Sequence, residues 1–153
     1  MATYLTAPLV LGDSMLDQDH AELSRLVQAL QTESGGAAVA ALDALRVEAR
    51  EHFDREDADL RRLGGNNAAC HLDEHAAVLL SLDEVRAILC GAATPPEMAQ
   101  RLIASLALEL QRWLPEHVSE MDASLAAVRC RSRFGGAPLR LARAEHLQRT
   151  RIE

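Results

Sequence analysis

The chain of 153 residues contains no lysine, only three cysteines, and few aromatic side chains, which make up 3% of it. Three cysteines without CxxC spacing leave at least one thiol unpaired, which argues against a disulfide framework and favours a reducing cytoplasm. We expect Cys70 to be a small buried thiol rather than a metal ligand. No apolar run approaches 18 residues and no basic residue precedes Arg25. Neither membrane insertion nor a signal peptide is therefore expected.

The scarcity of aromatic residues, with few and clustered glycines and prolines, also bears on the fold class. Alanine and leucine dominate the chain, and both favour helices over sheets. A chain of this length fits one domain and buries roughly 68–70% of its unfolded surface, enough for a core of its own. The predicted fold class is therefore all-α.

Charge is unevenly distributed along the chain, although the net charge is −7. Residues 1–128 hold nine arginines against 21 acidic residues, whereas residues 129–153 hold seven arginines against two glutamates. An acidic body argues against a nucleic-acid partner, because phosphate binding depends on basic surface. The Arg-rich tail could contact an anionic protein partner, although a solvated amphipathic tail is the simpler interpretation.

Apolar periodicity, broken by glycine and proline, predicts four helices. Asp13, Ser14 and Asp17 are candidate N-caps of the first. Pro115 lies inside the last helix, where it should distort the chain beside His117. The expected helices span about 13–33, 37–63, 68–90 and 96–128, followed by a basic amphipathic segment at 139–150. Short loops between helices predict an antiparallel up-down four-helix bundle, in which metal sites form from side chains on facing helices.

Histidines occupy positions in the predicted core. Residues 71, 75, 78, 82, 85 and 89 recur at helical spacing, so two imidazoles share a face that should be buried. One such histidine is usually just a buried imidazole with a hydrogen-bond partner. Coincidence is a poor explanation for five histidines on buried faces, because each imidazole would need its own hydrogen-bond partner. These five are His20, His52, His71, His75 and His117; only His146 lies outside, in the tail.

Glu56 shares the predicted buried face of His52, with no arginine on the same stripe. A bare buried carboxylate costs many kcal/mol unless it is protonated or coordinated. Imidazole combined with carboxylate suits a first-row transition metal, and five histidines exceed what one tetrahedral ion requires. The pattern therefore predicts two metal ions. Neighbouring acids such as Asp54, Asp57 and Asp59 are expected on the solvated face.

Four motifs contain these residues. They are DxxH at Asp17 to His20, HFxxE at His52 to Glu56, HxxxH at His71 to His75, and WLxxHxxxxD at Trp113 to Asp122. In this order the motifs resemble the hemerythrin family, more specifically single-domain bacterial hemerythrins, and the match covers about residues 13–128. Any one of them is weak alone, but jointly they are specific.

The resemblance implies a set of iron ligands. One iron would be held by His71, His75 and His117 and a second by His20 and His52, with Glu56, Asp122 and an oxo or hydroxo group as bridges. Spacing alone does not select Asp122, which lies about 140° around an ideal helix from His117. Glu120 and Met121 lie closer to that face. The resemblance favours Asp122, and Glu120 remains the alternative carboxylate.

The implied ligand count leaves an open position on the iron held by His20 and His52. In hemerythrin-like proteins the ligand there is dioxygen, bound reversibly for carriage, storage or delivery and without enzymatic turnover. Nitric oxide or small anions could occupy the same position. The resemblance also suggests Trp113 and Leu114 as walls of a dry oxygen pocket, although ordinary core packing explains them equally well. The di-iron bundle is expected over residues 1–130 and an Arg-rich extension over residues 131–153.

Two other classes of function fit the same residues. The first is an oxygen, redox or nitric oxide sensor that acts on a protein partner through the Arg-rich tail. The second is a di-iron enzyme that reduces nitric oxide or peroxide. A purely structural zinc bundle is disfavoured by the two bridging carboxylates.

Overall fold

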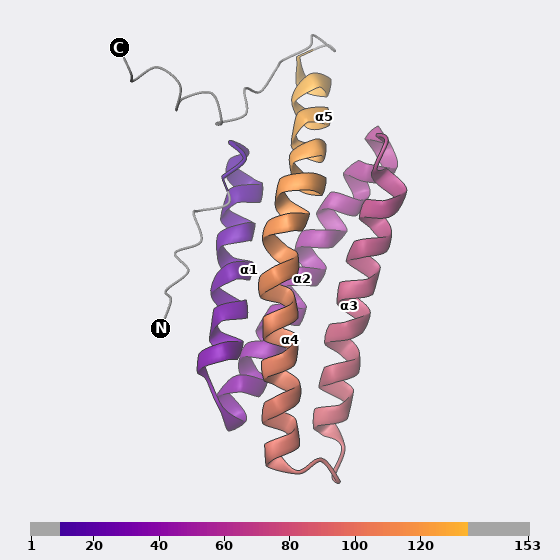
Figure 1. Cartoon of the computed structure of the whole chain (residues 1–153). Helices are drawn as coiled ribbons and strands as arrows, with labels where there is room; N and C mark the ends of the chain where they lie inside the picture. The colour runs from indigo at the N-terminus through magenta and orange to yellow at the C-terminus, as the bar shows by residue number, and fades with distance from the viewer. Residues whose placement is uncertain (1–9, 135–153) are drawn as a thin grey trace, which may run out of the picture.

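The computed structural model describes residues 10–134, which form an all-helical up-and-down bundle (Figure 1). The helices are α1 (Ser14–Thr32), α2 (Gly35–Leu63), α3 (Ala68–Cys90), α4 (Pro96–His117) and α5 (Ala123–Arg133), with a π-helical turn, η1 (Val118–Asp122), between the last two. α4, η1 and α5 form one continuous rod, so the four-helix prediction is confirmed. The basic segment expected at 139–150 lies outside the described residues, as does most of the 131–153 extension.

The start of α1 is held by two of the predicted capping residues. Asp13 has an extended backbone, and its carboxylate accepts from the backbone N–H of Met15 at 3.2 Å and of Leu16 at 3.3 Å. Asp17 accepts from two backbone N–H groups of the incoming segment, at 2.7 and 3.0 Å. The bonds of Asp13 satisfy donors that a helix start leaves unpaired, and those of Asp17 hold the incoming segment against the first turn of α1.

Substituting Asp13 by alanine is expected to lower the free energy of unfolding by about 1 kcal/mol, because two helix N–H groups lose their acceptor. Urea unfolding followed by circular dichroism measures the change. Asp54→Ala, at an exposed position of α2, is the matched control and should leave the midpoint in place. Equal midpoints for the two variants would show that Asp13 does not stabilise α1.

The turn between α2 and α3 depends on glycine. Gly64 has φ +67° and Gly65 φ +128°, conformations in which a side chain is strained. The backbone N–H of Gly64 still donates to Leu60, so α2 ends with its last carbonyl groups partly satisfied. The turn sends α3 back along α2, which brings the histidines of α3 opposite the carboxylate of α2.

The apolar core fills the half of the bundle away from the α2–α3 turn. On α1, Leu16, Leu23, Val27 and Leu30 are buried on the same face as His20. The core residues include Leu23, Leu26, Val27 and Leu30 of α1, Leu42, Leu45, Ala49 and Phe53 of α2, Leu82 and Val85 of α3, and Ile103, Leu106, Ala107, Leu110 and Leu114 of α4. On α4, Leu102 and Trp113 are only half-buried, whereas Ile103 and Leu114 are fully buried.

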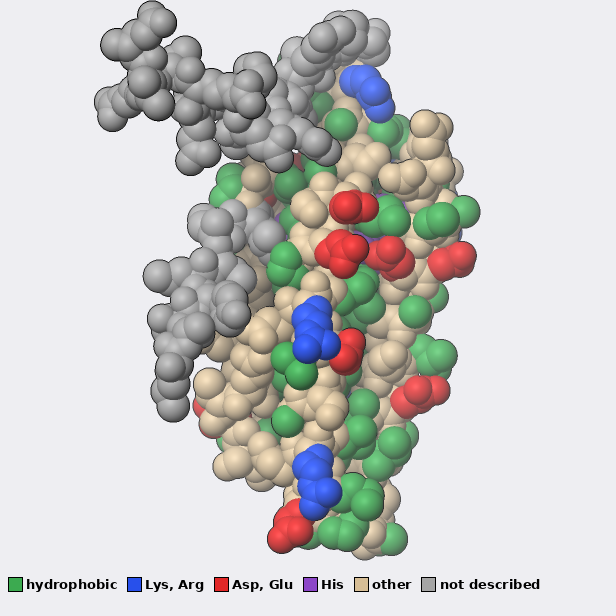
Figure 2. Space-filling model, viewed as in Figure 1, with side chains coloured by type: hydrophobic (Ala, Val, Ile, Leu, Met, Phe, Trp, Pro, Cys, Tyr) green, Lys and Arg blue, Asp and Glu red, His purple; other side chains and the backbone are tan. Residues whose placement is uncertain are grey.

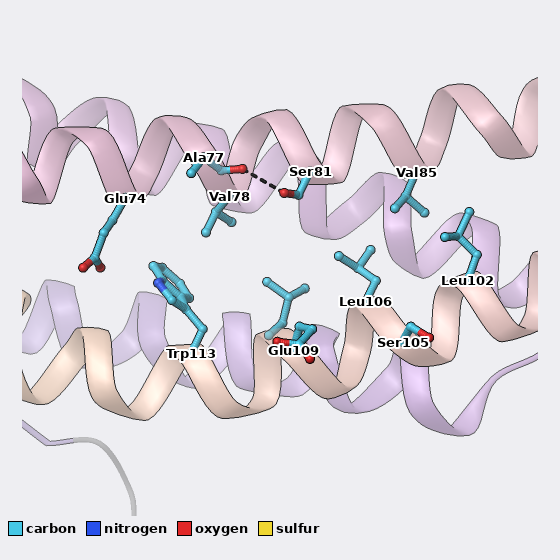
Figure 3. Close-up of a pocket in the computed structure, with 11 residues that line it drawn as sticks. Glu74, Ala77, Val78, Ser81, Val85, Leu102, Ser105, Leu106, Glu109 and Trp113 are labelled. Atoms are coloured by element: carbon cyan, nitrogen blue, oxygen red, sulfur yellow. Dashed lines mark hydrogen bonds between the residues drawn. The ribbon is translucent and has the colours of Figure 1, made fainter.

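The physical reason is a cleft of about 390 Å³ between α3 and α4. Figure 3 shows Trp113 and Leu102 among the residues that line it. Hydrophobic side chains follow the same seam on the face seen in Figure 2. Val78, expected on a buried face, is half-buried for the same reason. The two helices lie too far apart along this seam to bury the side chains between them.

Two further expectations can be compared with the described residues. Cys70 is exposed, so its predicted burial was wrong: the inward position of this turn belongs to its neighbour, His71. Cys90 is also exposed and Cys130 is half-buried, and all three thiols are free. Within residues 10–134, none of the helices combines the length and the apolar character needed to cross a membrane.

Candidate metal centre

All seven residues proposed as ligands lie together in the interior of the bundle. Each is at most 3% exposed. They form two overlapping groups, within each of which the potential ligand atoms all lie within 4.8 Å of one another. The groups are His71, His75 and His117 with both carboxylates, and His20 and His52 with the same two carboxylates, Glu56 and Asp122.

Asp122 faces both groups with different oxygen atoms. Its Oδ2 lies 2.7 Å from Nε2 of His20. Its Oδ1 lies 2.9 Å from Nε2 of His71 and 3.0 Å from Nε2 of His117. A carboxylate that offers one oxygen to each of two histidine groups is placed to bridge two cations.

Glu56 shows the same division. Its Oε1 lies 3.4 Å from Nε2 of His52, whereas its Oε2 lies 3.1 Å from Nε2 of His75 and 3.5 Å from Nε2 of His71. Each of the two carboxylates therefore has one oxygen beside each histidine group. Glu56 is on α2 and Asp122 is at the end of η1, and the five histidines come from α1, α2, α3 and α4, so all of these elements must pack together for the centre to form.

The π-helical turn explains how Asp122 reaches the centre. The backbone N–H of Ala123 donates to the carbonyl of Val118, five residues back, which widens this turn. The residue five positions after His117 then comes round to the same face, instead of the residue three or four positions after it. Glu120, the carboxylate that ideal spacing allowed, is exposed. The distortion expected beside the proline of this helix takes the form of this turn, three residues further on.

Three acidic side chains accept hydrogen bonds from the outer nitrogen of a histidine. Asp57 accepts from Nδ1 of His75 at 2.6 Å, Glu74 from Nδ1 of His117 at 2.6 Å, and Asp19 from Nδ1 of His52 at 3.0 Å. Such bonds fix the orientation of each ring and leave Nε2 facing the centre. The expected solvated role of Asp57 was wrong, since its side chain is 17% exposed and holds His75.

These three acids were missed by the reasoning from sequence, although the sequence contains a signal for them. Each directly adjoins a residue of the centre, because Asp19 precedes His20, Asp57 follows Glu56 and Glu74 precedes His75. Each also lies one helix earlier in the chain than the histidine that it holds. The sequence alone does not show the contact with that histidine, because it forms only when neighbouring helices pack together.

Two aromatic rings support histidines of the larger group. Phe53 stacks on His75, with ring centroids 4.0 Å apart and an angle of 10° between the rings. Trp113 stacks on His117 at 4.2 Å and 25°. Figure 3 shows Trp113 and Glu74, two of the side chains that contact His117, at the same end of the cleft between α3 and α4. These imidazoles are therefore held by ring contacts as well as by hydrogen bonds.

Trp113 and Leu114 both line a small, wholly apolar cavity of about 20 Å³ beside the centre. Phe53 forms another part of its wall and also contacts the rings of His52 and His75. A cavity of this size has room for roughly one water-sized molecule, but an apolar wall gives water nothing to bond. The cavity is thus suited to a small apolar molecule.

The histidines and carboxylates shift each other's protonation equilibria. Burial lowers the pKa of His71, but contacts with Asp122 and Glu56 outweigh it and raise the pKa to about 9. The pKa of His117 is also raised, since Asp122 and Glu74 outweigh its burial. Burial would raise the pKa of Asp122, yet the surrounding imidazoles hold it well below its usual range. The carboxylates are therefore ionised, as metal ligands must be.

The centre contains buried polar atoms whose bonding within the protein is incomplete. Nε2 of His52 and both carboxylate oxygens of Glu56 are buried without a hydrogen bond of proper geometry, although donors and acceptors lie within 3.1–3.5 Å. Atoms left in this state normally cost free energy. Ligand atoms that bind the same cation lie close together in this way without forming hydrogen bonds to one another. The donor set, five imidazoles and two carboxylates, fits iron.

Comparison with known proteins agrees with this geometry. The model of the hemerythrin HHE cation binding domain matches residues 11–129. The chain belongs to the hemerythrin family. A bacteriohemerythrin from Ralstonia nicotianae is 35% identical over 114 residues, which cover 74% of this chain and 79% of that protein. No solved structure matches the chain. Hemerythrin membership implies iron binding, and together with the buried cluster it supports oxygen binding at a di-iron site.

Proposed function

We propose that this hemerythrin binds dioxygen reversibly at a carboxylate-bridged di-iron centre. The observation that carries the proposal is the division of each carboxylate between the two histidine groups. His71, His75 and His117 would hold one iron and His20 and His52 the other, and Glu56 and Asp122 would serve both. An oxo or hydroxo group would complete the bridge.

When bound, the iron pair supplies the electrons and the binding position for oxygen. The protein determines where oxygen binds by the number of imidazoles that it presents. Three histidines on one side and two on the other leave the position beside His20 and His52 open to a small ligand. Imidazoles are neutral, so they should favour the higher oxidation states of iron less strongly than the glutamate-rich centres of ferritin-like proteins. This ligand set therefore supports reversible binding.

The apolar side chains next to the centre should exclude water from it. Leu114 is 6% exposed and lines the small cavity with Trp113. We assign these two residues to the oxygen pocket, because a dry wall withholds the water and protons that would drive the bound ligand out. Nitric oxide and small anions would compete for the same open position.

We further propose that the protein carries, stores or delivers oxygen and is not an enzyme. The family supports this, because hemerythrins are generally oxygen-binding proteins rather than enzymes. The three free thiols favour the cytoplasm. A protein partner at the Arg-rich tail would be needed only for a sensor.

The proposal predicts stoichiometric oxygen uptake without turnover. Iron-loaded, reduced protein should take up about one dioxygen per di-iron centre, and should consume nitric oxide or peroxide in the presence of a reductant no faster than free iron does. Gas electrodes measure both quantities. Sustained consumption that is abolished by His20→Ala would contradict the carrier function and support an enzyme.

A further inference from the structure

The two histidine groups differ in how firmly the protein holds them. In the larger group, Nδ1 of His75 and Nδ1 of His117 each donate to a carboxylate oxygen at 2.6 Å. The aromatic rings of Phe53 and Trp113 stack on the same two imidazoles. This half of the centre therefore holds two of its three imidazoles, those of His75 and His117, in a fixed geometry before any metal arrives.

The smaller group has weaker support. Nδ1 of His52 donates to Oδ2 of Asp19 at a longer distance, 3.0 Å, and the same oxygen accepts from Arg55 at 2.7 Å. Nδ1 of His20 is buried and has no hydrogen-bond partner. Asp57, which supports His75 of the larger group, also has an arginine nearby. This arginine, Arg61, is 68% exposed and lies 3.7 Å from Oδ2 of Asp57, the oxygen that does not bond to His75.

Hydrogen bonding of this kind changes the strength of a metal ligand. A carboxylate that accepts from Nδ1 makes the imidazole more basic and holds its ring in the orientation for binding. An arginine on the same carboxylate oxygen competes for that acceptor and places a positive charge near a cation site. A buried N–H without an acceptor supplies neither effect.

We propose that the protein fills its two metal positions in a fixed order. The group of His71, His75 and His117 binds first and tightly, and the group of His20 and His52 binds second and more weakly. Asp57 and Glu74 act as positioning residues for the first metal. Arg55, acting through Asp19, keeps the affinity for the second metal low. This inference rests on the proposed function, because it takes the seven buried residues as ligands of two metals.

The order can be measured on the full chain without oxygen. Metal-free protein is titrated with ferrous ion under anaerobic conditions, and native mass spectrometry counts the protein molecules with zero, one and two metals. We expect a well-populated one-metal species, with the second dissociation constant larger than the first by about tenfold or more, in the range that lost outer hydrogen bonds produce. Passage from zero to two metals without that species would overturn the proposal.

Arg55 provides the sharpest variant. Arg55→Gln should tighten the second binding step several-fold and leave the first unchanged, because only Asp19 loses a competing donor. Arg62→Gln is the matched control: it removes one arginine from the same helix, and Arg62 pairs at 2.8 Å with Asp59, away from the centre. An equal effect of the two variants, or an effect of Arg55→Gln on the first step, would overturn the role of Arg55.

Asp57 tests the other half of the order. Asp57→Asn should weaken the first step by about 10–100-fold, the usual loss on removing an outer carboxylate, and Asp57→Glu should recover part of that affinity. A merely structural role would weaken both steps equally and would not be rescued by glutamate. All of these measurements are made without oxygen. Ordered metal loading in a protein that then fails to bind oxygen would leave the order intact and contradict the proposed function alone.

Discussion

Asp122→Asn is expected to reduce the iron content of the protein from two ions per chain to one or none. The asparagine has nearly the same volume, but it removes the negative charge and replaces one of the two carboxylate oxygens with an NH2 group, which cannot bind a cation. Oδ1 and Oδ2 of Asp122 contact the imidazoles of both groups at 2.7–3.0 Å, so neither metal position is left intact. Elemental analysis of purified, iron-loaded protein measures the loss. Circular dichroism confirms that the variant is folded.

Glu120→Gln is the matched control for Asp122, because it makes the same chemical change in the same π-helical turn. Glu120 is exposed, whereas Asp122 is fully buried. We expect the control to retain two irons per chain. Iron loss in the control, or two irons in Asp122→Asn, would show that the carboxylate of this helix has been assigned to the wrong residue.

Phe53→Ala is expected to lower the free energy of unfolding by about 3–5 kcal/mol, more than Asp13→Ala. The Phe53 side chain is 1% exposed and lies where the apolar core meets the centre. Its removal leaves a cavity and also deprives His75 of the ring stacked on it at 4.0 Å. Denaturant unfolding of the metal-free protein isolates the packing contribution from that of the metal.

Val47→Ala, on the same helix but 59% exposed, is the control for Phe53 and should change the unfolding free energy by less than about 0.5 kcal/mol. The iron-loaded Phe53 variant should also bind its metals more weakly than the wild type. A loss of stability below about 1 kcal/mol for Phe53→Ala would mean that the neighbouring side chains collapse into the space.

Much of the fold and the centre could be predicted because the signals are local. The apolar residues recur every 3.6 positions, which shows which face of each helix is buried. His20 and His52 stand out because they are polar residues on that face. Asp122 could not be found in this way. An ideal helix turns it away from His117, and the π-helical turn that corrects this leaves no periodic signal in the sequence. Resemblance to the hemerythrin motifs selected it instead.

The remaining differences between prediction and structure depend on distances between helices. Val78 was expected on a buried face, but the cleft between α3 and α4 leaves it half-buried. Asp57 was expected in solvent, but the packing of α2 against α3 brings it to His75. A sequence shows which face of a helix is apolar, but it does not show how closely the next helix approaches that face.

The most direct test of the central claim is a visible absorption spectrum of the iron-loaded, reduced protein, recorded before exposure to oxygen, after exposure, and after oxygen has been removed. Reversible binding predicts a band that appears with oxygen and disappears when oxygen is removed, over repeated cycles. Immediate and lasting conversion to the oxidised, oxygen-free spectrum, with no reversible band, would contradict reversible oxygen binding.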